Sequence, residues 1–445
     1  MDGTDAHTRD HAVGTIMRIR ASCDYTTGVT QIFWWLHAHV IGRRDVCVGW
    51  RVRIPFKFYT RNTSGDCVCE CIMNPICRRA LRPVSDVCPR HCIAVHNVAY
   101  DVRHFDHPGG RVLLELCGGQ DATELFEMSH VNHAAALRVL KTLPVAGHTE
   151  NTPIHEYSRY ADLRSKVLRI FPTRASRSAS METHLRVTVC TLTAIVLHIG
   201  LLVGTSTVNA TWIFLCLLSA FANTLLGAYG HNGVHRVQPH ALGLDWNGLS
   251  SFEWLSEHVI SHHCHVNTEC DHDAVSMEPI LVWLPRRPNV LCGSAQTSWV
   301  RHLVYTFSEL IVAFQGTCVH ATRWKAVAYG APWWMCVAPL LFVFRVVSYY
   351  AFHPPLFATL TLLATMTPAG YAFATLAHLT HDQVAQTSSK CIVERQLRNT
   401  RDIEPFGLRG ELTLFLDRQC VHHLFPTIDH TAFSRELVHL ARCLS

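Results

Sequence analysis

Residues 211–235 read TWIFLCLLSAFANTLLGAYGHNGVH, and this stretch decides what kind of fold the chain can adopt. Residues 211–229 contain no charged side chain and are long enough for a helix to cross the roughly 30 Å of hydrocarbon in a bilayer. His231 and His235 follow directly. Two histidines four residues apart share one face of a helix, a spacing that suits ligation of one metal ion. The stretch therefore predicts a transmembrane helix that carries two metal ligands at its end.

Three further stretches are apolar and long enough to cross a bilayer. They cover residues 187–204, 331–349 and 355–377. The short connections 205–210 and 350–354 hold no Lys or Arg, whereas the segments at the other ends of the spans are rich in Arg. By the positive-inside rule we expect both short loops outside and the rest of the chain in the cytosol. The sequence thus predicts a mainly α membrane protein with four transmembrane helices and a cytosolic His-rich cap.

The composition favours a metalloenzyme in a membrane. Hydrophobic residues make up 49% of the 445 residues and charged residues 16%, against about 25% charged in typical soluble domains. These values exclude a disordered chain, and a net charge of +5 without a basic patch gives no sign of a nucleic-acid partner. Histidine is unusually frequent, with 31 residues, and the 19 cysteines are expected to be mostly reduced thiols.

Arg345 is a charged residue within the third span, where charge is unusual. Its side chain is expected to snorkel outward or to mark a helix interface.

Two further histidine clusters lie after the second and fourth spans. They are HVISHH, residues 258–263, and QCVHHLFP, residues 419–426. On an α-helix His263 would lie about 100° around from His262 and could reach a second metal ion. A single cytosolic histidine is more often a solvated residue than a ligand. Three clusters on the same expected side of the membrane instead indicate a metal centre.

A different pattern precedes the spans. The motif HPGG, residues 107–110, is followed by GGQDATELFEMSH, which ends at His130. The combination resembles cytochrome b5, a small α+β domain. The resemblance implies a haem b held by His107 and His130, with His133 as the alternative second ligand, and Gly109 and Gly110 would let the backbone turn beside the ring. A haem with two axial imidazoles passes electrons and does not bind oxygen.

The order HxxxH, HxxxHH and QxxHH, with the haem module in front, resembles the front-end branch of the membrane fatty acid desaturases. The resemblance implies two non-haem iron ions. The implied catalytic and metal-binding histidines are His231, His235, His258, His262, His263, His422 and His423. One more ligand is expected between the fourth span and the last cluster, where His378 is favoured over His381, and Gln419 is expected as a weak ligand or a hydrogen-bond donor to one. Asp271 and Asp273 either cap a helix or orient ligand N–H groups.

The resemblance implies an oxidoreductase that uses O₂ to introduce a double bond between an existing double bond and the carboxyl end of an acyl chain. The expected substrate is a fatty acyl-CoA, an acyl-lipid or a ceramide-type lipid. Electrons are expected from NADH through cytochrome b5 reductase to the haem and on to the irons. We expect a multi-pass protein of the endoplasmic reticulum with the haem domain and histidines in the cytosol. The alternatives are a lipid hydroxylase of the same family and a non-catalytic, membrane-anchored haem electron carrier.

The expected domain order has four segments. Residues 1–77 show no periodicity and are expected to be disordered or to be a wrongly assigned extension; residues 78–148 form the haem domain, 149–185 a basic linker with an amphipathic helix, and 186–445 the desaturase domain. The chain ends sooner after HLFP than the family pattern suggests. The residues just before Gln419, LFLDR, also depart from that pattern, which predicts a different lining of the acyl channel.

Overall fold

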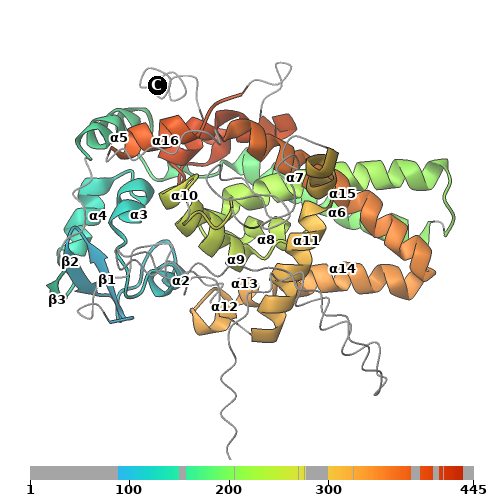
Figure 1. Cartoon of the computed structure of the whole chain (residues 1–445), viewed down its shortest axis with the longest axis horizontal. Coiled ribbons are helices and arrows are strands. Elements are labelled where there is room, and N and C mark those ends of the chain that lie inside the picture. Colours follow the sequence, from blue (N-terminus) through green and yellow to red (C-terminus); the bar gives the residue numbers. More distant parts are fainter. Residues whose placement is uncertain are drawn as a thin grey trace, which may run out of the picture. The chain divides into compact units, whose positions relative to one another are not determined.

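The structure is a computed structural model, and it describes residues 89–149, 157–204, 206–268, 270–274, 276, 299–323, 325–381, 391–403, 410–413 and 415–433. The expectation for residues 1–77 lies outside the described residues. Figure 1 shows a mostly helical chain in which the labelled strands lie between Cys92 and His148, in the segment expected to bind haem (residues 78–148, hereafter the haem-binding segment). This arrangement confirms the expected class, a mainly α membrane protein with a small α+β part.

The described part of the haem-binding segment holds a three-stranded antiparallel sheet with three short helices. The strands are β1 (Cys92–Val95), β2 (Val98–Asp101) and β3 (Val145–His148), in the order β1-β2-β3, and the helices are α2 (Arg111–Leu116), α3 (Thr123–Ser129) and α4 (His133–Leu140). His96 and Asn97 both have positive φ, 51° and 65°, and form the two-residue turn between β1 and β2. A two-residue hairpin turn needs this conformation to match the strand twist.

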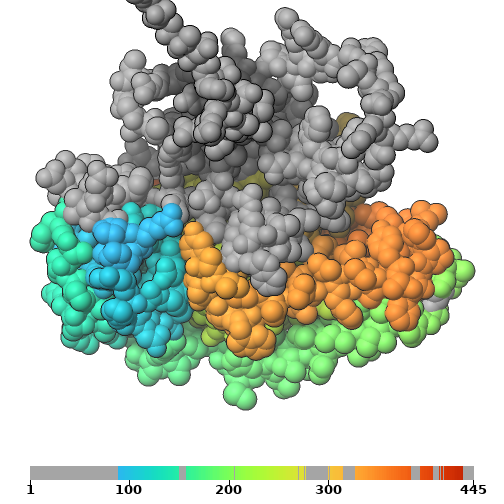
Figure 2. Space-filling model, turned by 90° about the horizontal axis from the view of Figure 1, so that it is seen from below, coloured from blue at the N-terminus to red at the C-terminus, as the bar shows by residue number. Residues whose placement is uncertain are grey.

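Among the residues that the structure describes, four helices are long and apolar enough to cross a membrane, which confirms the four expected spans. They are α6 (Met181–Val203), α7 (Ala210–Val234), α13 with α14 (Trp333–Val337 and Pro339–Phe352), and α15 (Pro355–Thr380). Large apolar side chains on the outer face of α6 are exposed, among them Leu185, Val189, Leu192 and Val196. Parts of these outer surfaces are visible in green and orange in Figure 2. Apolar surface of this extent is expected where a helix faces lipid.

Arg345 does not snorkel outward; it lies at a helix interface. Its side chain is buried, and its guanidinium donates hydrogen bonds to Thr365 Oγ1 at 2.9 Å and to the Trp246 carbonyl at 3.3 Å. A charged group at this depth requires such polar partners, because lipid offers none. The contacts tie α14 to α15 and to the short helix α8 (Leu242–Trp246).

The histidine clusters lie on short elements around the ends of α7 and α15. These are α9 (Ser251–Trp254), η3 (Leu255–His262), α10 (His263–His265), α16 (Ile392–Asn399), η6 (Leu416–Arg418), α17 (Gln419–Leu424) and η7 (His430–Ala432). The remaining helices are α5 (Ser158–Ile170), η1 (Ala175–Arg177), η2 (Pro239–Ala241), α11 (Trp299–Arg323), α12 (Lys325–Ala328) and η5 (Gly410–Thr413). The second cluster differs from expectation, because η3 is a π-helix and not an α-helix. Hydrogen bonding from i to i+5 brings His258 and His263 toward one face.

Candidate metal centre and haem site

The three histidine clusters converge on one buried region. His231 lies in the last turn of α7, His258 and His262 lie in η3, and His422 and His423 lie in α17. All of them are buried, and so are His235 and His263. The structure therefore brings together every histidine of the three sequence clusters, although they are as much as 192 positions apart between His231 and His423.

The ring nitrogens face one another at short distances. The Nε2 atom of His258 lies 2.8 Å from that of His231 and 3.3 Å from that of His263. The Nε2 atom of His381 lies 3.2 Å from those of His262 and His423. Two groups result, each with its ligand atoms within 4.8 Å of one another: His231, His235, His258 and His422 form one, and His262, His381 and His423 form the other. His263 lies beside both, with ring centroids 4.7 Å from His235 and 4.3 Å from His423.

In five of the histidines the opposite ring nitrogen, Nδ1, contacts an acceptor outside the two groups, whereas the Nδ1 atoms of His231, His235 and His263 are buried without a hydrogen-bond partner among the described residues. His262 Nδ1 lies 2.9 Å from Asp271 Oδ2, and His258 Nδ1 lies 2.9 Å from Asp273 Oδ2. The remaining contacts are those of His381 Nδ1 with the Ala377 carbonyl at 2.8 Å, of His423 Nδ1 with Gln396 Oε1 at 3.1 Å, and of His422 Nδ1 with His430 Nε2 at 2.7 Å. Acceptors of this kind fix the tautomer and orientation of metal-ligating histidines. Of the two interpretations of Asp271 and Asp273, the structure supports the orienting role.

These contacts test whether metal ions fit the site. In His381 and His423 the acceptor at Nδ1 places the hydrogen there, which leaves a lone pair on Nε2. Burial lowers the pKa of His381 to about 4 and that of His423 well below its ordinary value, so both rings are neutral. Two lone pairs facing each other at 3.2 Å repel unless a cation lies between them. The donor set therefore fits divalent metal ions, which neutral imidazole binds well.

Charge around the second cluster raises the basicity of one ligand. Burial by itself would lower the pKa of His262, but the Asp271 carboxylate outweighs it and raises this pKa above the ordinary value. The pKa of the Asp273 carboxyl is lowered to about 2 because its hydrogen bond to His258 outweighs its own burial. Both carboxylates are therefore ionised at neutral pH, and they make the attached imidazoles better electron donors to a metal.

The geometry favours His381 over the expected His378 as the extra ligand. His378 Nε2 lies 3.3 Å from Arg301 Nη1 and outside both histidine groups. His381 takes that place because α15 ends at Thr380 and the next residue has an extended backbone. Gln419 is buried, and the nitrogen of its side-chain amide lies 3.3 Å from His381 Nε2, beside the three-histidine group.

Two residues of the site were missed by the sequence analysis. His430 follows the third cluster on a separate turn, η7, and its closeness to that cluster in the sequence was the one available signal. Gln396 lies in α16 without a neighbouring ligand pattern, so the sequence holds no signal for it. Both residues act on a ligand only through tertiary contacts.

The expected haem ligands face each other across the haem-binding segment. The rings of His107 and His130 have centroids 5.9 Å apart, and His130 Nδ1 lies 2.8 Å from the Phe126 carbonyl, which leaves Nε2 as the free nitrogen. Burial lowers the pKa of His107 to about 4 and thus keeps it neutral. A Cβ at Gly109 would lie 2.9 Å from His107 Cε1, so only glycine fits there, and Gly110 has a φ of +101°. These features fit a haem held between His107 and His130.

His133 is engaged elsewhere. Its Nε2 lies 2.9 Å from Glu127 Oε1, a buried carboxylate that also pairs with His96 and Arg164. A histidine held by this ion cluster is a poor candidate for a haem ligand, so the geometry favours His130 over the alternative.

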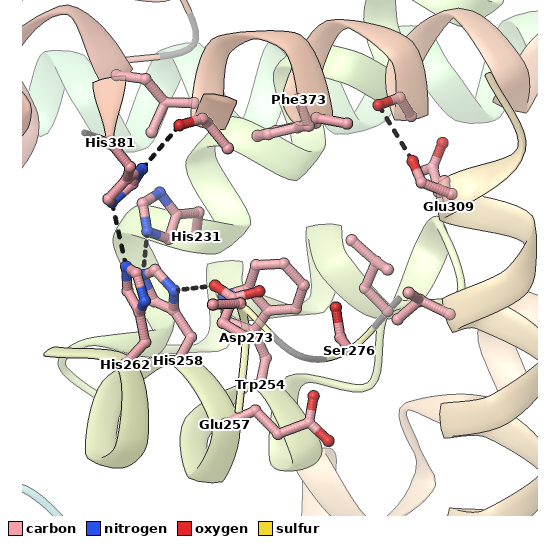
Figure 3. Close-up of a pocket in the computed structure, with 18 of the residues that line it drawn as sticks. His231, Trp254, Glu257, His258, His262, Asp273, Ser276, Glu309, Phe373 and His381 are labelled. Carbon is pink, nitrogen blue, oxygen red and sulfur yellow. Dashed lines mark hydrogen bonds and ion pairs between the residues drawn. The ribbon is translucent and has the colours of Figure 1, made fainter. Parts of the chain in front are cut away.

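A pocket lies beside the histidines of both groups (Figure 3). It is a cavity of about 180 Å³, and its lining includes His231, His258, His262 and His381 on one side. Apolar residues of α8, α11 and α15 form much of the remaining wall, among them Leu244, Val312, Phe373, Ala374 and Ala377. Glu309 on α11 lies across the pocket from the histidines in Figure 3. The pocket can hold an apolar chain with one of its carbon atoms beside the histidines.

Comparison with known proteins gives two families on one chain. Residues 207–442 match the fatty acid desaturase family, and residues 86–162 match the cytochrome b5-like haem/steroid binding domain. The acyl-lipid (7-3)-desaturase of Diacronema lutheri is 25% identical over 374 residues, which cover 77% of this chain and 81% of that protein. The acyl-lipid (9-3)-desaturase of Physcomitrium patens is 25% identical over 418 residues, 83% of this chain and 76% of that protein. No solved structure matches this chain significantly.

Proposed function

Because the chain belongs to the fatty acid desaturase family, we propose that it is a front-end desaturase that uses O₂, a histidine-held pair of irons and electrons from its own haem domain. The chain is an oxidoreductase of the acyl-lipid desaturase kind, its cytochrome b5-like domain implies haem, and its desaturase domain implies iron. The finer points rest on the residues of the site. The observation that carries the proposal is the convergence of buried imidazoles, among which the neutral His381 and His423 face each other with their Nε2 lone pairs.

The residues divide into those that would hold the irons and those that orient them. His231, His235, His258, His262, His263, His381, His422 and His423 would be the iron ligands. Bound iron would supply the O₂-dependent removal of hydrogen from an unactivated C–H bond. Asp271 and Asp273 keep two of these rings in the ligating tautomer, and His430 and Gln396 do the same for two others.

The pocket supports an acyl substrate. Its apolar wall would hold a chain by burial of methylene groups, each worth about 0.8 kcal/mol, with the carbon atoms to be desaturated beside His262 and His381. The reaction converts two methylene carbons and one O₂ into a double bond and two waters, with two electrons and two protons supplied. An acyl-CoA, an acyl-lipid and a ceramide-type lipid all offer such a chain.

The ends of the helices support the proposed topology. His231 and His235 lie at the C-terminal end of α7, and His381 lies at the C-terminal end of α15. These ends are joined in one cluster and must lie on the same side of the membrane. We infer that this is the cytosolic side of the endoplasmic reticulum membrane, where NADH–cytochrome b5 reductase would reduce the haem.

Expression in yeast tests the proposal. Cells that make the full chain are fed polyunsaturated fatty acids, and total fatty acids and long-chain bases are profiled by mass spectrometry. We expect a new double bond, which His262→Ala should abolish while the haem spectrum stays unchanged. Product formation by His262→Ala would refute the iron assignment. A hydroxylated product would instead support a hydroxylase, and one iron per chain rather than three would support an electron carrier.

A further inference from the structure

The end of α3, in the haem-binding segment, shares a hydrophobic core with α17, which carries the third histidine cluster, and with α5 and α16. This core contains Met128 and Val131, residues of α5, and residues of α16 and α17. Its other members include Tyr160, Leu163, Val167, Ile392, Val393, Val421, Leu424 and Phe425, all of them buried. Close-packed cores hold their members in one arrangement. The haem-ligand segment, residues 128–130, is therefore fixed against the metal-ligand segment, residues 422–425.

Three side chains add polar links across this core. The Tyr160 hydroxyl donates to the Leu424 carbonyl at 2.5 Å and lies 3.4 Å from the Met128 carbonyl. Thr427 Oγ1 donates to the Ser129 carbonyl at 3.0 Å. Gln396 Nε2 lies 4.0 Å from Met128 Sδ and donates to the His263 carbonyl at 2.7 Å, while its Oε1 holds His423.

The Tyr160 and Gln396 links reach a ligand or its sequence neighbour on the metal side, and Thr427 lies four residues after His423. Ser129 and Met128 precede His130, and Leu424 directly follows His423. Ion pairs between Arg395 and Glu124 and between Arg164 and Glu127 reinforce the same contact. The side chains of all four charged residues are at most 13% exposed, so solvent screens these pairs only weakly.

We propose that Tyr160, Gln396 and Thr427 clamp the haem-ligand segment onto the metal-ligand segment, so that electrons pass from haem to metal within a single chain. The inference rests on the proposed function. Each transfer oxidises a ferrous haem to the ferric form and reduces the histidine-held centre by one electron. Two transfers, with re-reduction of the haem by the reductase between them, complete one turnover. The three residues are positioning residues, because they touch the ligand segments and not the substrate.

The first test measures the clamp without reference to activity. Hydrogen–deuterium exchange of the purified full chain follows the amides of α3 and α17. We expect faster exchange in both helices for Tyr160→Phe and for Thr427→Val, because each change removes a link and leaves a buried carbonyl without its donor. Tyr350→Phe, which removes a hydroxyl that contacts Thr359 on α15, is the matched control and should leave both helices unchanged. Unchanged exchange in both clamp variants would overturn the clamp.

The second test measures electron transfer. Full-length protein loaded with haem and iron is reduced at the haem and mixed with O₂ and the substrate found in yeast, and the ferrous haem band is followed in time. The rate constant of haem oxidation in the wild type should be independent of protein concentration. In each clamp variant this rate constant should be about fivefold lower, which corresponds to the net free energy of one hydrogen bond. The haem band and the iron content are measured in the same samples, to show that each variant carries its cofactors. If Tyr160→Phe does not fold, the comparison of Thr427→Val with the wild type decides the result.

The two tests separate the inference from the proposed function. A wild-type rate that rises in proportion to protein concentration would show transfer between chains and overturn the inference. Equal rates of haem oxidation in the wild type and both variants would also overturn the inference. A wild-type haem that is not oxidised on addition of O₂ and substrate would count against the proposed function, while the exchange experiment would still decide the clamp.

Discussion

Replacement of Asp271 by Asn tests how the second histidine cluster is held. The Asp271 carboxylate is fully buried, and its two oxygens accept hydrogen bonds from His262 Nδ1, from the Asn267 amide at 2.8 Å and from the Ala274 amide at 3.0 Å. Asparagine keeps one acceptor oxygen and adds an NH₂ group. One of the two backbone amides would then face a donor.

Two effects of known size follow from this geometry. An unsatisfied buried amide costs about 1–3 kcal/mol of stability. Loss of the carboxylate also removes the group that raises the pKa of His262, and changes to such partners lower metal affinity by about 10–100-fold. We therefore expect Asp271→Asn to have a lower unfolding temperature and to bind ferrous iron at least tenfold more weakly.

The same substitution at the less buried Asp273, Asp273→Asn, tests whether the loss of iron affinity depends on burial of the carboxylate. The side chain of Asp273 is 33% exposed, and the one oxygen of an asparagine there can still accept from His258. Its loss of iron affinity should be clearly smaller. Asp101→Asn, in the haem-binding segment, is the control and should leave iron binding unchanged.

The assay is anaerobic titration of metal-free protein in detergent with ferrous iron, with bound iron measured by mass spectrometry and the haem band recorded in parallel. Wild-type affinity in Asp271→Asn would refute the orienting role of the carboxylate. Equal losses in Asp271→Asn and Asp273→Asn would refute the argument from burial.

Three further predictions follow from single contacts. His381→Ala should lose iron from the three-histidine group while His378→Ala keeps it, as judged by metal content, and the reverse pattern would restore the sequence-based preference. Gly109→Ala should displace His107 and lower haem occupancy several-fold in the visible spectrum, because a Cβ would lie 2.9 Å from the ring; full occupancy would show that the backbone can yield. Burial raises the pKa of Glu309 to about 8, so the folded chain keeps a proton that the unfolded chain loses near pH 4.3, and stability should fall as the pH rises between these values. The unfolding temperature should therefore decline less with pH in Glu309→Gln, and identical pH profiles would contradict this.

Local patterns made much of the architecture predictable. The four spans follow from uninterrupted apolar length, which is a property of each segment by itself. The facing of His107 and His130 was predictable because HPGG and the following His130 lie on adjacent elements of a small domain. The clusters at 231–235, 258–263 and 422–423 were visible because the histidines of each lie within a few positions of one another in the sequence.

The choice between His378 and His381 shows where such patterns fail. Both residues lie within the same few positions, and only the end of α15 at Thr380 and its packing against α11 turn His381 toward His262. The π-helical backbone of η3 is a second case, because its i to i+5 bonds move His263 to a position that an α-helix would not give it.

The sequence by itself determined a four-helix membrane protein with a haem module in front and three sets of histidines, because apolar length and short-range spacing are written in contiguous residues. Only the tertiary structure decided which of two neighbouring histidines joins the centre, which acceptors hold each ring, and how the segment around Met128 meets the one around His423. Those contacts join residues 27 positions apart in Gln396 and His423, 42 in His381 and His423, and 268 in Met128 and Gln396. They depend on how the helices pack rather than on any local pattern.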